Sequence, residues 1–244
     1  MAISTGFDFG TEEVVEGGGS FKNPEEGDHS AVLRSIIHCG IFRETYLKEK
    51  KKPAPQVVAI FELKDEEDFE EDGVTPLTIH KSFPLKKGDK AFMTKFISAL
   101  DPKGEAGGFD ELIGKPCQVN CKGSKEKNDD GTPKYINFGG LSSMLPKFAK
   151  MIDPLTIEGV GHVPFDELTK AAVLELNPVL EVSRILMEGD RYSGSKAEEV
   201  VNAIRVDNPE FAVYKKKKED KKEDKKDADS QPEKEANLKE DEEF

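Results

Sequence analysis

The sequence predicts a mostly β fold, in which a five-stranded barrel with one helix between its third and fourth strands precedes a helical segment and a charged tail. Runs rich in β-branched and aromatic residues alternate with turn-forming stretches over residues 29–144. One run between them repeats its apolar residues at helical spacing. Residues 215–244 carry almost no apolar side chains, so they cannot offset the entropy of ordering and are expected to be disordered.

The first three strands follow a glycine-rich and acidic stretch, residues 1–28, which we expect to be a flexible arm, either disordered or docked. Gly40 lies where the first strand is expected to bulge or kink, and Pro84 ends the third strand. Long charged loops separate the strands, which we expect at residues 29–46, 57–64 and 75–85.

A helix is predicted within residues 86–102, because Phe92, Phe96 and Leu100 recur at helical spacing and Asp101 with Pro102 forms a stop. Two further strands are expected within residues 109–125 and 134–144, joined by a polar loop. Three strands, a helix and two strands is the element order of the OB-fold, a Greek-key barrel. The predicted OB domain therefore covers residues 29–150.

Residues 151–214 are expected to form a helical appendage, in which Ser195 and Glu198 make a capping box ahead of an apolar helix face. Three roles remain open for it: covering the barrel, forming a dimer, or mediating cooperative binding. A homo-oligomer is therefore one of the expected arrangements.

Charge is distributed unevenly along this chain of net charge −13. The acidic stretch at residues 62–72 contributes −7, and the rest of residues 29–150 carries +9. An acidic chain thus contains one locally basic domain, which favours an anionic partner.

The cysteine count is odd, and no leading segment resembles a signal peptide, so we expect a protein of a reducing compartment. No long apolar segment is present, so we expect no association with a membrane.

Enzyme and metal motifs find little support, and we predict no enzyme, cofactor or metal site. The sequence contains no GxSxG, Walker-type, GxGxxG or HExxH motif. Cys117 and Cys121 would lie roughly 13 Å apart along one strand, too far to share a zinc ion. Nothing around Glu66 indicates a buried carboxyl group, so the acidic loop is expected to be a solvated surface.

Nucleic-acid binding is the function that the residue pattern favours, because cations alternate with aromatic residues near the predicted strands. Single-stranded DNA requires cations along its phosphates and flat rings on which its bases stack. Tyr46 and Tyr135 lie beside lysine-rich loops and are expected to stack on bases. Phe92 and Phe96 are expected to lie in the core. The choice between stacking and core stays open for Phe42, Phe61, Phe83 and Phe138. The candidate DNA-binding residues are Arg43, Tyr46, Lys50, Lys51, Lys52, His80, Lys81, Phe83, Lys86, Lys87, Lys122, Lys125, Lys127, Lys134 and Tyr135.

The OB-like run from His29 to about Met144 and the closing EDEEF together resemble the single-stranded DNA-binding proteins that tailed bacteriophages encode. The resemblance implies a role in DNA replication, recombination and repair in the cytoplasm of the infected host. It also implies that an acidic tail recruits replication proteins, such as a polymerase or helicase, and competes with DNA for the basic cleft. The tail residues to which this role carries over are Asp241, Glu242, Glu243 and Phe244.

This chain departs from the family in two respects, because its tail mixes lysines with acids and its residues 151–214 have no place in a minimal OB protein. Two other functions stay open. An acidic scaffold or DNA mimic would bind a basic protein and ignore oligonucleotides. A nuclease would use the acidic loop to hold Mg²⁺.

Overall fold

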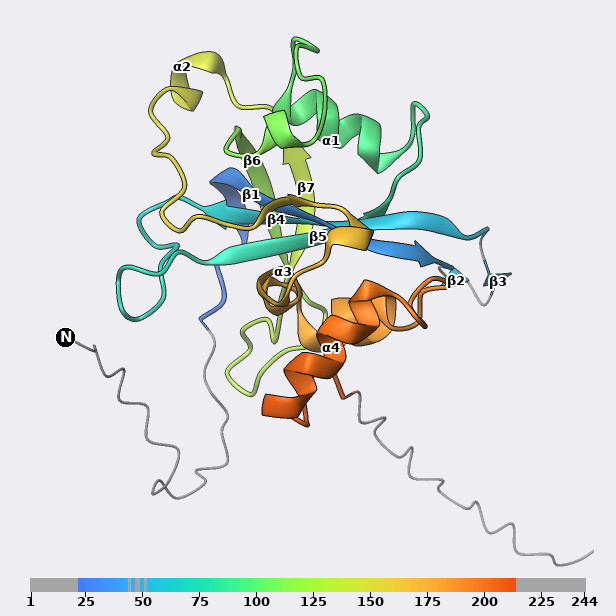
Figure 1. Cartoon of the computed structure of the whole chain (residues 1–244). Helices are drawn as coiled ribbons and strands as arrows, with labels where there is room; N and C mark the ends of the chain where they lie inside the picture. Colours follow the sequence, from blue (N-terminus) through green and yellow to red (C-terminus); the bar gives the residue numbers. More distant parts are fainter. Residues whose placement is uncertain (1–21, 44, 47–48, 51, 214–244) are drawn as a thin grey trace, which may run out of the picture. The chain divides into compact units, whose positions relative to one another are not determined.

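An open six-stranded sheet forms the centre of the fold (Figure 1). The structure is a computed structural model that describes residues 22–43, 45–46, 49–50 and 52–213. Two short strands, β2 (Thr45–Tyr46) and β3 (Glu49–Lys50), pair separately. The strands of the main sheet are β1 (Gly27–Phe42), β4 (Ala54–Leu63), β5 (Thr78–Pro84), β6 (Pro116–Gly123), β7 (Ile136–Ser142) and β8 (Gly161–Val163).

The order across the sheet is β5-β4-β1-β6-β7, with antiparallel neighbours, and β8 pairs with β1 in parallel. Helix α1 (Phe92–Leu100) lies between β5 and β6 in the chain. The five predicted strands and the helix are therefore confirmed in their order. The sheet is not closed into a barrel, since no ladder joins edge strands β5 and β7 in the described part of the chain, and the fold is mixed α/β rather than mostly β.

The long strand β1 changes register at Gly40, as the sequence predicts. The pairing with β4 shifts between His38 and Ile41, and Gly40 has a φ of 78°, in the left-handed region that favours glycine. A Cβ at this position would lie 2.8 Å from Cε2 of Phe165. Both the backbone conformation and the close approach of this ring therefore require glycine.

Helix α1 packs on one face of the sheet. Phe96 of this helix is fully buried, and its ring centre lies 6.2 Å from that of Phe61 in β4 and 5.1 Å from that of Phe83 in β5. The helix ends at Leu100 and Asp101 is its C-cap, as the sequence predicts. The undecided Phe61 thus belongs to the core, as does Phe96, whereas Phe42, Phe92 and Phe138 are partly buried.

The later part of the segment after β7, residues 160–213, covers the opposite face of the sheet with a second core. Its side chains pack against Ile37 of β1 and Val58 and Ile60 of β4, and helices α3 and α4 lie on the other side of the sheet from α1, whereas α2 lies on the side of α1 (Figure 1). Residues 151–213 are thus part of the same compact unit as the strands. The helical elements of the segment are α2 (Pro146–Ala149), η2 (Phe165–Glu167), α3 (Lys170–Glu175), the π-helix η3 (Pro178–Leu186) and α4 (Lys196–Asp207).

The predicted cap of α4 is present. The Ser195 hydroxyl accepts a hydrogen bond from the Glu198 amide at 3.4 Å. The Glu198 carboxylate in turn accepts one from the Gly194 amide at 2.7 Å. Two amides at the start of the helix are therefore satisfied by side chains.

Two histidines contribute to the attachment of β8 to β1. Nε2 of His38 lies 2.9 Å from Nε2 of His162, and Nδ1 of His162 lies 3.2 Å from the Asp110 carboxylate. In the arrangement that satisfies both contacts, His162 donates from Nδ1 to this carboxylate and its Nε2 accepts a hydrogen bond from Nε2 of His38. Burial, with a smaller contribution from His162, lowers the pKa of His38 to about 4.

The cysteines are free and buried, as expected for structural thiols. Burial raises the pKa of Cys117 and of Cys121 to about 12, which keeps both protonated.

Within the described residues, no helix combines the length and the apolar character that a membrane span requires.

Candidate nucleic-acid interface

A groove of about 550 Å³ lies between β5 and β7, where the sheet stays open. Residues 22–24 and Glu70 line one part of the groove, and residues of η3 line another part. A cleft of this size is within the range that holds a small organic group, about 300–1,000 Å³. The two edge strands contribute Thr78, Ile79, His80, Lys81 and Ser82 from β5 and Ile136, Asn137 and Phe138 from β7.

Lys81 is the cation of β5 within this groove. Side chains alternate along a strand, so Lys81 shares its face with Ile79 and Phe83, which pack beside α1. Its Nζ lies 5.5 Å from the ring centre of Phe92 and 5.7 Å from that of Phe138. Among the described residues, no carboxylate lies within ion-pair distance of Lys81, whose ammonium group lies beside these two rings.

His80 points to the other face of β5. Its Nδ1 lies 2.9 Å from Oε2 of Glu181 in η3, and the same carboxylate oxygen accepts a hydrogen bond from the Asn177 amide. The helices of residues 151–213 thus cover the face of β4 and β5 on which His80 lies. An OB barrel is expected to bind DNA on one face of its second and third strands, which are β4 and β5 here. The face of these strands that carries His80 is covered by the helices and is not exposed.

The β6–β7 hairpin carries the largest group of exposed candidate residues. Tyr135 is 52% exposed, and Nζ of Lys134 lies 5.4 Å from its ring centre. Tyr135 directly precedes Ile136, which borders the groove. Near Tyr135, the positions of β6 and β7 that point outward are polar and exposed. The four lysines of the hairpin are also exposed: Lys122, Lys125, Lys127 and Lys134.

Phe83 requires a correction. It is only 1% exposed, and its ring centre lies 4.9 Å from that of Phe92 and 5.1 Å from that of Phe96. The alternation of β5 turns this ring toward α1, so Phe83 is a core residue and cannot stack on a base.

The other candidates lie outside the groove lining or outside the described residues. Arg43, Lys52, Lys86 and Lys87 are exposed, and none of them lines the groove. The side chains of Tyr46, Lys50 and Lys51 and the tail residues Asp241, Glu242, Glu243 and Phe244 fall outside the part of the chain that the structure describes.

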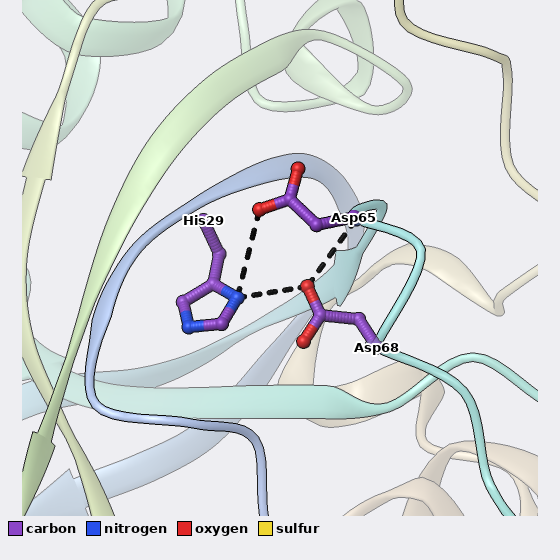
Figure 2. Close-up of side chains that lie close together, drawn as sticks. All are labelled: His29, Asp65 and Asp68. Carbon is purple, nitrogen blue, oxygen red and sulfur yellow. Dashed lines mark hydrogen bonds and ion pairs between the residues drawn. The ribbon is translucent and has the colours of Figure 1, made fainter.

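The acidic loop contains a buried carboxyl group that its local sequence does not indicate. Asp68 is 1% exposed, and its Oδ2 lies 2.8 Å from Nδ1 of His29 on β1 (Figure 2). Burial raises the pKa of Asp68, partly offset by the contact with His29. The expectation of a fully solvated loop is therefore wrong, because a residue 39 positions away in the sequence covers it.

Comparisons with known proteins do not identify the chain: no protein-family model matches it, and a search of curated proteins finds no similar sequence. Function is therefore inferred from the geometry of the groove and the hairpin.

Proposed function

We propose that this protein binds single-stranded DNA without sequence specificity, through the β6–β7 hairpin and the groove between β5 and β7. It is not an enzyme in this proposal. The fold that we infer is an OB-fold opened between its third and fifth strands. The order β5-β4-β1-β6-β7 supports this inference, because it corresponds to strands 3-2-1-4-5 of that barrel, with α1 in the expected place.

The observation that carries the proposal is the exposed Tyr135, with the ammonium group of Lys134 beside its ring, next to the groove-lining strand β7. A base stacked on an exposed aromatic ring contributes about 1–3 kcal/mol, whichever base it is. A base in a duplex is already stacked on both faces, so this contact selects unpaired strands.

Cations supply the second component of binding. Lys122, Lys125 and Lys127 on the hairpin and Lys81 in the groove can neutralise consecutive phosphates of a strand that passes over Tyr135. Each neutralised phosphate releases condensed counterions, so the affinity falls steeply as salt rises. The acidic net charge of the whole chain does not prevent this, because the cations are concentrated locally.

The biological role that fits this activity is coating of transient single strands during phage DNA replication, recombination and repair in the host cytoplasm. In this role the acidic tail, Asp241 to Phe244, recruits replication proteins and competes with DNA for the cations. The tail contributes to this proposal through its sequence and its resemblance alone.

The experiment that tests the proposed function is a fluorescence-anisotropy titration of a labelled oligo-dT and of a duplex of equal length at low salt. We expect saturable binding of the single strand and much weaker binding of the duplex. Absence of binding, or equal affinity for both, would contradict the proposal; binding of a basic protein in their place would favour a DNA mimic.

A further inference from the structure

Three side chains from two segments converge beside β1: His29 from the strand, and Asp65 and Asp68 from the acidic loop (Figure 2). Nδ1 of His29 lies 2.8 Å from Oδ2 of Asp68 and 3.7 Å from Oδ2 of Asp65. The three atoms all lie within 4.8 Å of one another. Ligand atoms that surround a metal ion at about 2.0–2.2 Å are separated from one another by about 3–4 Å.

The hydrogen bonds around His29 direct Nδ1 toward the two carboxylates. Nε2 lies 3.0 Å from the carbonyl oxygen of Glu25. A carbonyl oxygen only accepts, so Nε2 carries the hydrogen, and Nδ1 faces the carboxylates with a lone pair or a second proton. Histidines that bind metals commonly donate their other ring N–H to a backbone carbonyl in this way, which fixes the ring orientation.

The backbone also fixes the two carboxylates. The Ser30 amide donates to Oδ2 of Asp65 at 3.1 Å, and the Asp65 amide donates to Oδ2 of Asp68 at 3.3 Å. Two carboxylates held beside one imidazole nitrogen favour a positive charge between them. A proton on Nδ1 would donate a hydrogen bond to Asp68 only, since Asp65 at 3.7 Å is within ion-pair distance but beyond hydrogen-bond distance.

An orphaned oxygen provides independent support for a cation. Oδ1 of Asp68 is buried and has no hydrogen-bond partner among the described residues. Leaving a buried acceptor without a partner is unfavourable, and more so when it is charged. A metal ion bound by this carboxylate would compensate the charge on both of its oxygens.

We propose that His29, Asp65 and Asp68 bind one divalent transition-metal ion, through Nδ1 and the two carboxylates. A donor set of one imidazole nitrogen and two carboxylate groups suits Mn²⁺ and Zn²⁺, whereas Mg²⁺ and Ca²⁺ prefer oxygen ligands alone. The surrounding acidic stretch, residues 62–72, adds an excess of negative charge that attracts a cation.

The ion has a structural role in this proposal. It fixes residues 25–30 to the acidic loop, and the adjacent residues 22–24 and Glu70 border the groove. Lys22 already connects the same two segments, because its Nζ donates to the carbonyl oxygens of Glu67 and Phe69. The ion therefore holds one wall of the groove in place.

Mn²⁺ is the probe of choice, because this hard ion disfavours thiol ligands and its free form gives an electron paramagnetic resonance signal that decreases on binding. The full chain, stripped with a chelator, is titrated with Mn²⁺ alone. The variants are Asp65→Asn and His29→Gln, with Glu66→Gln as the matched control. Glu66 is an exposed neighbour, so its variant has the same charge change as Asp65→Asn. Asparagine at position 65 retains an acceptor oxygen for the Ser30 amide, so this variant is expected to fold.

We expect one Mn²⁺ per chain in the wild type and in Glu66→Gln, and a melting temperature that rises with added Mn²⁺. Asp65→Asn and His29→Gln are expected to bind at least about tenfold more weakly, since loss of even an outer-shell partner costs about 10–100-fold. Zn²⁺ should displace Mn²⁺ from the same site. Unchanged Mn²⁺ binding in both variants would place the ion on other acidic residues and overturn the proposal, as would absence of saturable binding by the wild type.

Discussion

The ammonium group of Lys81 lies 5.7 Å from the ring centre of Phe138, across the open side of the sheet between β5 and β7. The two residues belong to the edge strands that a closed barrel would pair. The opening thus brings a cation and an aromatic ring together in a groove instead of a hydrogen-bonded ladder. These are the two chemical groups that a single strand of DNA requires.

Replacement of Lys81 by alanine is expected to weaken oligo-dT binding about three- to tenfold at low salt, because one phosphate contact is lost. The slope of log affinity against log salt should become shallower by about 0.7. Lys81→Arg, which keeps the charge, should retain most of the affinity. Titrations over a series of salt concentrations measure both quantities.

The control for this variant is Lys103→Ala, because Lys103 has a 75% exposed side chain and does not line the groove. Its removal changes the net charge equally. If both alanine variants lost the same affinity and the same salt slope, the groove would have no specific role in binding.

Replacement of Tyr135 by alanine is expected to reduce oligo-dT affinity by about 1–3 kcal/mol, which is about five- to 150-fold, because a stacking ring is lost. Tyr135→Phe keeps the ring and should bind nearly as well as the wild type. The ring is 52% exposed, so neither change should lower the melting temperature appreciably. Equal losses in both variants would assign the effect to the hydroxyl group and contradict stacking.

Gly40→Ala is expected to destabilise the protein by about 2–5 kcal/mol, from a left-handed backbone and a contact with Phe165. Gly131→Ala separates the two causes, because Gly131 has a φ of 86° and a Cβ at this position would have nothing within 4 Å. This variant should cost only about 1–2 kcal/mol. Denaturant unfolding measures both, and similar losses would show that the ring moves aside without cost.

Stability should fall as the pH decreases from about 6.5 toward 4, in part because of His38. Its pKa is lowered from 6.5 to about 4 in the folded protein, so in this window the unfolded chain binds more protons. His38→Gln is non-titrating and can still bond to His162. The difference in melting temperature between pH 7 and pH 5 should therefore be smaller for this variant; an unchanged difference would exclude His38 as the cause.

The order of the strands and the position of α1 could be predicted, because they depend on local periods and turn residues. The bulge at Gly40 and the cap at Ser195 were likewise visible as local signals. Strand β8 was missed, since three residues carry no recognisable alternation. The opening between β5 and β7 was missed as well, because closure depends on contacts between distant strands.

The candidate site divides in the same way. The exposure of Tyr135 agrees with its position beside a lysine-rich loop. The burial of Phe83 depends on which face of β5 turns toward α1, and its local sequence did not reveal that face. The burial of Asp68 depends on His29, which lies on another element and was not part of any acidic motif.

The most direct test of single-strand binding is the oligo-dT titration of the wild type, with Tyr135→Ala, Tyr135→Phe and an equal-length duplex measured in parallel. We predict saturable single-strand binding that is strongly weakened by Tyr135→Ala, retained by Tyr135→Phe, and much weaker for the duplex. Oligo-dT binding that is absent, or that is the same for all three proteins and for the duplex, would contradict the proposed function.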